Sequence, residues 1–235
     1  PTACCSCSWR WVCESWVKCG ERHMKTVLCY GDSLTWGYDP ESRSRHALED
    51  RWPSALAASL GEGVHVVADG LNGRTTAFDD FTGDCDRNAT KTLPTALHAH
   101  APLDLVVIML GSNDMKPAVA GTAHAASKGL RRLVQLVRLH NWPVEQDVPQ
   151  ILVVAPPPLV ETADPDFAAM FEGGVEQSAM LASFYADLAD EMGAGFFDAG
   201  SVAECSAIDG VHLDARNTRA IGRGLSPVAR LLLGH

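Results

Sequence analysis

One serine of this chain has the surroundings of a catalytic nucleophile. Ser33 follows the β-rich apolar stretch 26–30 and the pair Gly31-Asp32. This pattern is typical of a parallel strand that turns toward a helix, and open α/β sheets bind their ligands at the carboxyl ends of their strands. In an alternative interpretation Asp32 and Ser33 only cap the following helix, because both residue types are favoured at N-caps.

A carboxylate and an imidazole that could activate this serine lie near the end of the chain. Asp209 and His212 are three positions apart in a predicted loop, 199–213. A neutral serine is a poor nucleophile, so it needs an imidazole to take its proton and a carboxylate to hold that imidazole in the right tautomer. An Asp/His pair with a purely structural role would have the same spacing, so Asp209 and His212 indicate catalysis only together with Ser33. For the other eight of the nine histidines we expect surface or packing roles.

Donors for the negative charge of an acyl-transfer intermediate follow three separate predicted strands. The candidates are the backbone N–H groups of Ser33 and Gly73 and the side-chain amide of Asn113. Such an intermediate needs N–H groups directed at its oxyanion. We expect the three donors to meet at one edge of the sheet, because the carboxyl ends of parallel strands lie together.

The elements that must position these residues alternate between strands and helices. Apolar runs predict strands, and apolar residues at helical spacing predict helices. Polar loops are predicted at 39–50, 77–91 and 141–148. This alternation predicts a five-stranded parallel sheet in a three-layer α/β/α sandwich. The predicted strands are 26–30, 64–68, 104–110, 151–155 and 195–198, and the predicted helices are 51–60, 119–139, 175–192 and 216–233.

Length and charge limit the kinds of protein that this chain can be. With 235 residues, 46% of them hydrophobic and 20% charged, one well-buried domain is expected. The net charge of −10 and the lack of a Lys/Arg block argue against nucleic acid as a partner. No stretch approaches the roughly 18 to 20 continuous apolar residues that span a bilayer, so no membrane association is expected.

The first 23 residues differ from the rest, because they hold five of the eight cysteines and three of the six tryptophans. Polar residues interrupt them too often for a secretory signal. We expect 1–23 to be a non-native or disordered segment before a domain at 24–235. The cysteine spacings do not form two C-x-x-C pairs, so no metal is expected. Few cysteines remain, and Cys29 lies in an apolar strand, which suits a reducing cytoplasm.

Four motif blocks in this order resemble the SGNH (GDSL) hydrolase superfamily. GDSL at 31–34 resembles its first block, Gly73 its second, GSND at 111–114 its third and DGVH at 209–212 its fifth. The resemblance covers residues 25–233. Residue 35 is Thr, so Ser33 is not in a G-x-S-x-G sequence, which argues against the nucleophile elbow of α/β-hydrolases.

The resemblance also suggests a subgroup and residue roles. The strings GDSLTWG, LDLVVIMLGSND, PPPL, FEGG and DAGSV are similar to the aryl-esterase group, whose members also perform acyl transfer and perhydrolysis and form homo-octamers. It implies a flavodoxin-like fold, a catalytic triad and an oxyanion hole, and no cofactor. The triad would be Ser33 as nucleophile, His212 as base and Asp209 as its orienting carboxylate, and the oxyanion donors would be Ser33, Gly73 and Asn113.

The expected activity is hydrolysis of small acyl or aryl esters, with alcohols or hydrogen peroxide as further acyl acceptors. The alternatives are a carbohydrate acetyl esterase, a lysophospholipase-type esterase and, outside enzymes, a non-catalytic binding protein on the same fold. We expect a narrow, apolar substrate pocket. Its predicted lining residues are Leu34, Trp36, Tyr38, Ser112, Pro157, Phe171 and Val211.

Overall fold

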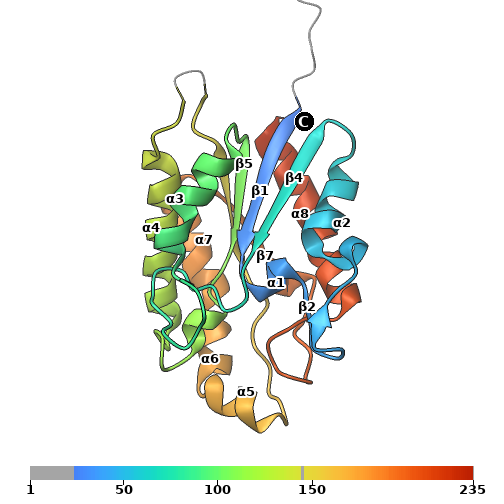
Figure 1. The fold of residues 1–235 in the computed structure, drawn as a ribbon, viewed down its shortest axis with the longest axis vertical. Coiled ribbons are helices and arrows are strands. Elements are labelled where there is room, and N and C mark those ends of the chain that lie inside the picture. The colour runs from blue at the N-terminus through green and yellow to red at the C-terminus, as the bar shows by residue number, and fades with distance from the viewer. Residues whose placement is uncertain (1–23, 144–145, 235) are drawn as a thin grey trace, which may run out of the picture.

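A five-stranded sheet forms the centre of the protein (Figure 1). The computed structural model describes residues 24–143 and 146–234, so the predicted segment 1–23 lies outside it. The strands lie in the order β4-β1-β5-β6-β7, and each pairs in parallel with its neighbours. This confirms the predicted parallel sheet. The strands are β1 (Lys25–Gly31), β4 (Val64–Gly70), β5 (Leu105–Met109), β6 (Gln150–Ala155) and β7 (Gly195–Asp198).

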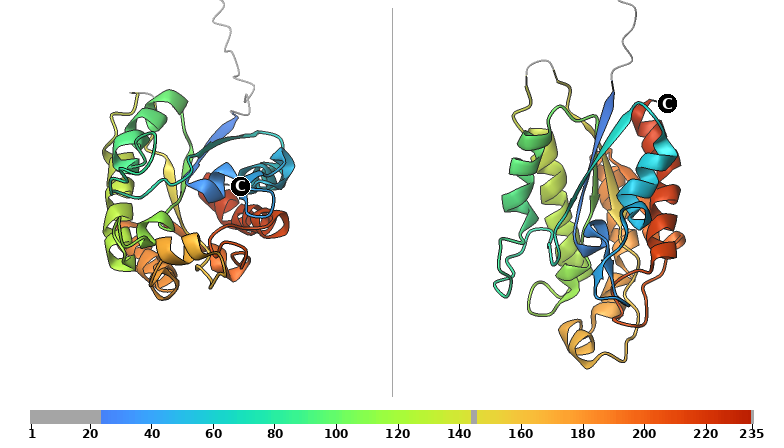
Figure 2. Two further views of the ribbon diagram at one scale, coloured as in Figure 1. Left: turned by 60° about the horizontal axis from the view of Figure 1, so that its bottom comes forward. Right: turned by 45° about the vertical axis from the view of Figure 1, so that its right-hand side comes forward.

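Helices cover both faces of the sheet, as the three-layer prediction requires (Figures 1 and 2). Helices α2 (Trp52–Leu60) and α8 (Ala215–Leu233) cover one face. The other face is covered by α3 (Ala89–His100), α4 (Ala123–Leu139) and α7 (Leu181–Met192). Every residue of β5 is buried, as expected of a central strand between two helical layers. In the part of the chain that the structure describes, no helix combines the length and hydropathy needed to cross a membrane.

The strand order predicts a ligand-binding site at the carboxyl ends of β1 and β5. After β1 the chain forms β4 on one side of it, and the next strand, β5, pairs on its other side. In open parallel sheets, ligands bind beyond the carboxyl ends of the strands at such a reversal. This edge points downward in Figure 1, where α1 (Ser33–Trp36), α5 (Pro165–Met170) and α6 (Gly174–Ser178) lie.

The first region that differs from the prediction is helix α3, where the sequence pattern indicated no helix and a loop reaching residue 91. Asn88 caps this helix by accepting a hydrogen bond from the N–H of Thr90 at 3.0 Å. Leu93 and Leu97 are fully buried at helical spacing. Pro94 lies between them, and proline in a sequence is read as a helix breaker, although here it lies within the helix.

The predicted helix at 175–192 is in fact two helices, α6 and α7. The Ser178 hydroxyl donates to the carbonyl of Val175 and accepts from the N–H of Leu159, both at 2.9 Å. Side-chain bonds of this kind compete with the continuation of a helix. Helix α4 begins at Ala123 and not at 119, because Thr122 caps it.

The predicted loop at 39–50 also contains regular structure. It holds a short hairpin of β2 (Tyr38–Asp39) and β3 (Ser44–Arg45), followed by a 3-10 helix, η1 (Leu48–Asp50). Two further 3-10 helices, η2 (Asn113–Met115) and η3 (Ala199–Ser201), follow β5 and β7. Strands of two residues are too short to leave an alternating pattern in the sequence.

Candidate active site

Ser33 is the first residue of α1 and follows directly the turn that ends β1. The Asp32 carboxylate caps this helix, because its Oδ1 accepts a hydrogen bond from the N–H of Leu34 at 2.9 Å. The capping interpretation is therefore correct for Asp32. It does not account for the Ser33 hydroxyl, whose bond is to His212, 179 positions along the chain.

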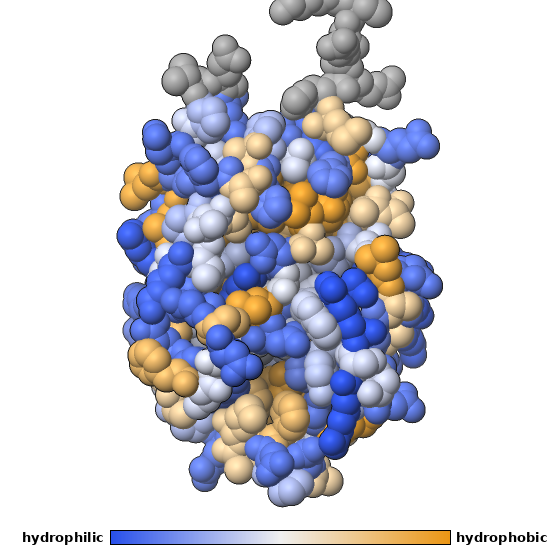
Figure 3. All heavy atoms as spheres, in the orientation of Figure 1, coloured by the Kyte–Doolittle hydropathy of each residue, from blue (hydrophilic) through white to orange (hydrophobic). Residues whose placement is uncertain are grey.

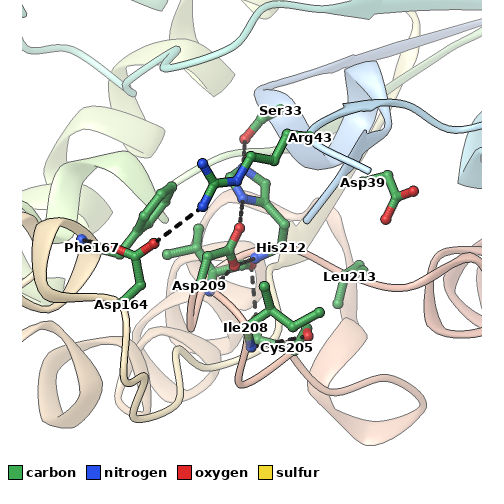
Figure 4. Close-up of polar contacts among 12 residues, drawn as sticks. Ser33, Asp39, Arg43, Asp164, Phe167, Cys205, Ile208, Asp209, His212 and Leu213 are labelled. Atoms are coloured by element: carbon green, nitrogen blue, oxygen red, sulfur yellow. Dashed lines mark hydrogen bonds and ion pairs between the residues drawn. The ribbon is translucent and has the colours of Figure 1, made fainter. Parts of the chain in front are cut away.

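A continuous chain of hydrogen bonds joins Ser33, His212 and Asp209 (Figure 4). Ser33 Oγ lies 2.8 Å from His212 Nε2, and His212 Nδ1 lies 2.7 Å from Asp209 Oδ2. All three residues are buried. An imidazole with its Nδ1–H on a carboxylate presents a basic Nε2, so this arrangement can take the proton of the serine hydroxyl.

The Asp209 carboxylate is held in its ionised form. Burial raises its pKa, but the hydrogen bond and charge of His212 and the backbone N–H groups of His212 and Val211 outweigh burial, so the pKa is lowered. These N–H groups donate to Oδ1 at 2.9 and 3.0 Å, which fixes the carboxylate and leaves Oδ2 facing the imidazole. The rings of Tyr38 and Phe167 lie 4.3 and 6.0 Å from the His212 ring, centroid to centroid, and confine it.

The three predicted oxyanion donors line one cavity with this histidine. Ser33, Gly73 and Asn113 come from three different segments of the carboxyl edge. Gly73 has φ of 82°, in the left-handed region that favours glycine. The Asn113 amide lies 3.4 Å from Asp32 Oδ2 and 3.3 Å from the carbonyl of Arg74, which fixes the plane in which its N–H groups point.

Two buried side chains tie these segments together. Arg74 donates to the carbonyls of Gly31 and Asp69, at the ends of β1 and β4, at 2.8 and 2.7 Å. The Asp114 carboxylate accepts a hydrogen bond from the N–H of Thr76, which lies 3.1 Å from each of its oxygens. It also accepts one from the Thr76 hydroxyl. The loop that carries Gly73 is therefore bonded to the strand end before Ser33 and to the residue after Asn113, so the fold itself holds the three predicted donors in place.

The cavity beside Ser33 has a volume of about 240 Å³ and contains three of the predicted pocket residues, Tyr38, Phe171 and Val211. The other four predicted pocket residues do not line it. Leu34, in α1, packs into the core between the sheet and helices α2 and α8. The Arg45 guanidinium lies 4.7 Å from the centre of the Trp36 ring, and Ser112 is buried. Pro157 is also buried, and its carbonyl accepts a hydrogen bond from the Cys205 thiol. The full lining is Ser33, Tyr38, Asn72, Gly73, Arg87, Asn113, Lys116, Phe167, Met170, Phe171, Val211 and His212.

A family model extends over most of the chain that builds this site. Residues 29–218 match the GDSL-like lipase/acylhydrolase family. The chain belongs to that family. It is therefore a GDSL-family carboxylic ester hydrolase, and the SGNH (GDSL) resemblance is confirmed. No curated protein matches the chain.

Several solved structures resemble this GDSL-family esterase over nearly its whole length. A carbohydrate acetylesterase family member from Sinorhizobium meliloti is 68% identical, with a TM-score of 0.89, and the match covers 90% of this chain and 100% of that one. A putative arylesterase from Agrobacterium tumefaciens is 50% identical, with a TM-score of 0.83 and coverage of 89% and 100%. The aryl esterase of M. smegmatis is 41% identical, with a TM-score of 0.84 and coverage of 88% and 99%.

A second, larger cavity lies at the other edge of the esterase's sheet. It has a volume of about 640 Å³, and its lining includes Lys25, where β1 begins, and Leu233, where α8 ends. Neither Ser33 nor His212 borders it. In an open parallel sheet the amino edge does not bind the reacting ligand, so size alone does not make this cavity the active site.

Five lining residues of the cavity were not predicted as site residues: the cationic Arg87 and Lys116, the apolar Phe167 and Met170, and Asn72 beside Gly73. Lys116 follows the GSND motif by two positions, and Phe167 lies four positions before Phe171, so nearness to a motif could have indicated both. Nothing in the polar loop around Arg87 indicated that it reaches Gly73.

Two buried carboxyl groups of the esterase should make its stability depend on pH. Burial raises the pKa of Asp32 to about 6 and that of Asp114 to about 7. A pKa above the unfolded value of about 3.9 means that the folded state holds the proton more tightly. The protonated carboxyl groups therefore give their full contribution to the free energy of unfolding below about pH 4. This contribution is lost as the pH rises through about 6 for Asp32 and about 7 for Asp114.

Asp114→Asn should flatten this dependence, because it removes one of the two groups. We expect the free energy of unfolding, measured in urea, to fall less between pH 4 and 8 in this variant than in the wild type. Glu62→Gln, on the exposed surface, is the matched control. If Asp114→Asn gives the same slope as the wild type, Asp114 does not hold a proton in the folded state.

Proposed function

We propose that this GDSL-family esterase removes acetyl and other short acyl groups from esters through an acyl-enzyme on Ser33. The observation that supports this best is the hydrogen-bonded chain Ser33–His212–Asp209 at the edge of a cavity that also holds Gly73 and Asn113. A non-catalytic role would not require all five groups to converge on one small cavity.

In the proposed mechanism, Ser33 Oγ attacks the ester carbonyl while His212 Nε2 takes its proton. The carbonyl oxygen becomes an oxyanion that accepts from the N–H groups of Ser33 and Gly73 and from the Asn113 amide. Protonated His212 then donates to the leaving oxygen, and the acyl group stays on Ser33. Water, activated by His212, attacks the acyl-enzyme, releases the acid and restores the serine.

Acetylated carbohydrates are the substrates that we favour. Two similar structures, 68% and 42% identical, are those of carbohydrate acetylesterases or members of that family. The cavity of about 240 Å³ is below the usual range of about 300 to 1,000 Å³ for ligand pockets, so it suits a short acyl group. A lysophospholipase-type activity would need room for a long acyl chain, which makes that alternative less suitable.

Aryl esters are the second candidate, and a specific feature of the cavity favours them. The rings of Tyr38, Phe167 and Phe171 line it, and those of Phe167 and Phe171 stack with centroids 6.4 Å apart. Aromatic rings pack favourably against one another, so these side chains would stabilise the bound aryl group of an ester. Two of the similar structures are described as an aryl esterase and a putative arylesterase.

The deciding experiment compares kcat/KM for an acetylated xylo-oligosaccharide, 4-nitrophenyl acetate and 4-nitrophenyl octanoate. The acetate esters should be cleaved well and the octanoate poorly. Labelling with a serine-directed organophosphonate, followed by peptide mass spectrometry, should place the adduct on Ser33. An adduct elsewhere, or preference for octanoate, would refute the proposal.

We also propose that the acyl-enzyme passes its acyl group to alcohols or hydrogen peroxide within a homo-octamer. Met170 lines the cavity and is 44% exposed, and Phe81 and Ile208, on other segments of the same edge, are 91% and 50% exposed. On the face in Figure 3, hydrophobic residues form several separate groups. A neighbouring subunit on the segments around the cavity would narrow the entrance and limit the access of water.

This proposal predicts an oligomer and a product ratio on the same sample. Light scattering should give the mass of an octamer. In water that contains a primary alcohol, the yield of transferred ester should exceed the share that the alcohol's concentration predicts. A monomer, or products in proportion to the excess of water, would leave the protein a simple hydrolase.

A further inference from the structure

The cavity beside Ser33 has two cationic side chains in its lining and no carboxylate. Arg87 and Lys116 are the cations, and the remaining lining residues are polar, aromatic or aliphatic apart from His212. The whole protein has a net charge of −10, so a cavity free of carboxylates departs from its overall composition. Apart from His212, the titratable cations of the lining are therefore not balanced by any carboxylate within the lining itself.

Both cations are close to the groups that do the proposed chemistry. A Cβ placed on Gly73 would lie 2.7 Å from Arg87 Nε and 2.9 Å from Arg87 Cζ, so the guanidinium packs directly against that glycine. Lys116 follows η2, which carries Asn113, and its Nζ lies 5.5 Å from the centre of the Phe171 ring.

One carboxylate, that of Asp80, forms ion pairs with both cations. Asp80 Oδ2 lies 2.9 Å from Arg87 Nη1 and 3.7 Å from Lys116 Nζ, and the Asp80 side chain is only 5% exposed. Burial raises the Asp80 pKa, but hydrogen bonds from Thr82 and Arg87 and the charge of Lys116 lower it to about 2. Asp80 is thus an anion that faces both cations. Asp32 is a second carboxylate whose charge acts on Lys116, and neither carboxylate lines the cavity, so the two cations are the charged groups that a ligand meets there.

The hydrogen-bonding capacity of the two cations is not used up. The Arg87 guanidinium makes one side-chain hydrogen bond to a described residue, from Nη1 to Asp80, so its Nη2 has no partner there, while Nε is enclosed without one. The 3.7 Å between Lys116 Nζ and Asp80 is longer than a hydrogen bond. Burial lowers the Lys116 pKa, and an anion in the cavity would offset that effect. A partly buried cation with unused donors gains more from a ligand anion than an exposed one does.

We propose that Arg87 and Lys116 select esters that carry a carboxylate on their acyl or alcohol part. This inference rests on the proposed esterase site at Ser33 and names its substrate class. A guanidinium and an ammonium beside one cavity can share the two oxygens of a carboxylate. The carboxylate is not consumed, because it only holds the ester while Ser33 attacks the carbonyl.

The test measures how the charge on the substrate couples to the charge on Lys116. Three esters are compared: 4-nitrophenyl acetate, which is neutral, 4-acetoxybenzoate, with its carboxylate on the leaving group, and the mono-4-nitrophenyl ester of adipic acid, with its carboxylate on the acyl group. For each enzyme, kcat/KM of an anionic ester is divided by kcat/KM of the neutral ester. Differences in intrinsic reactivity cancel when these ratios are compared between enzymes.

We expect Lys116→Met to lower the ratio roughly five- to twentyfold for at least one anionic ester, as for a close charge pair near a protein surface. The anionic ester that responds shows which part of the substrate faces the cations. Arg87→Met should act in the same direction. Lys116→Arg keeps the charge and should retain most of the ratio.

Lys91→Met is the matched control, because Lys91, in the first turn of α3, pairs with Asp79 at 2.6 Å but does not line the cavity. If Lys91→Met lowers the ratio as much as Lys116→Met, the effect is one of overall charge and the inference is wrong. Equal ratios in the wild type, Lys116→Met and Arg87→Met would also overturn it. If the wild type cleaves none of the three esters, the proposed function itself fails.

Discussion

Ser33→Ala is expected to lower kcat by about 10⁴ or more, because it removes the nucleophile and leaves only the catalysis that oxyanion donors and binding provide. The substitution should cost the fold little. Among the described residues the Ser33 hydroxyl bonds only His212 Nε2. The measurement is kcat on a short acetyl ester, together with the thermal midpoint of the same preparation.

Ser112→Ala provides a matched control for this variant. Ser112 is a buried serine at the end of the neighbouring strand, its hydroxyl makes no hydrogen bond to any described residue, and it does not line the cavity. Its kcat should remain within a few-fold of the wild type. If Ser33→Ala retains more than about a tenth of the activity, Ser33 is not the nucleophile, since removal of a triad member costs about 10⁴ or more.

The fold could be predicted because its strands have strong local patterns. β5 is apolar throughout and buried on both faces, which a continuous apolar run indicates directly. The positions of Ser33 and Asn113 followed from the same logic, because both come directly after such runs and parallel strands bring their carboxyl ends to one edge. Short elements were missed where a local pattern conflicts with tertiary structure, as with Pro94 inside α3.

The lining of the cavity could be predicted only in part, because the sequence does not show the direction of each side chain. Leu34 directly follows Ser33, but successive helical residues point about 100° apart, so Ser33 faces the cavity and Leu34 the core. Arg87 and Lys116 lie 29 positions apart, and both face the Asp80 carboxylate. Contacts of this kind form only when the chain folds, so they cannot be predicted from the spacing of residues within one loop.

Asn113→Ala is expected to lower kcat by about 10² to 10³ with a smaller change in KM. Before substrate binds, the two N–H groups of the Asn113 amide donate to Asp32 Oδ2 and to the Arg74 carbonyl at 3.4 and 3.3 Å. Both bonds are long, so exchanging one of them for a bond to the oxyanion costs little. A donor of this kind bonds the oxyanion more strongly than the ground-state carbonyl, and its loss therefore affects turnover more than binding.

Two further variants separate this role from a structural one. Asn113→Asp keeps the shape but puts a carboxylate near Asp32 and the oxyanion, so kcat should fall at least as far as in Asn113→Ala. Asn217→Ala should leave kcat near the wild-type value, because this asparagine lies on α8, where its side chain bonds Asp214 and the N–H of Glu204 and does not line the cavity. If Asn113→Ala raises KM and leaves kcat unchanged, the amide binds the substrate equally in the ground and transition states, and the oxyanion hole of this esterase must be built from Ser33 and Gly73 alone.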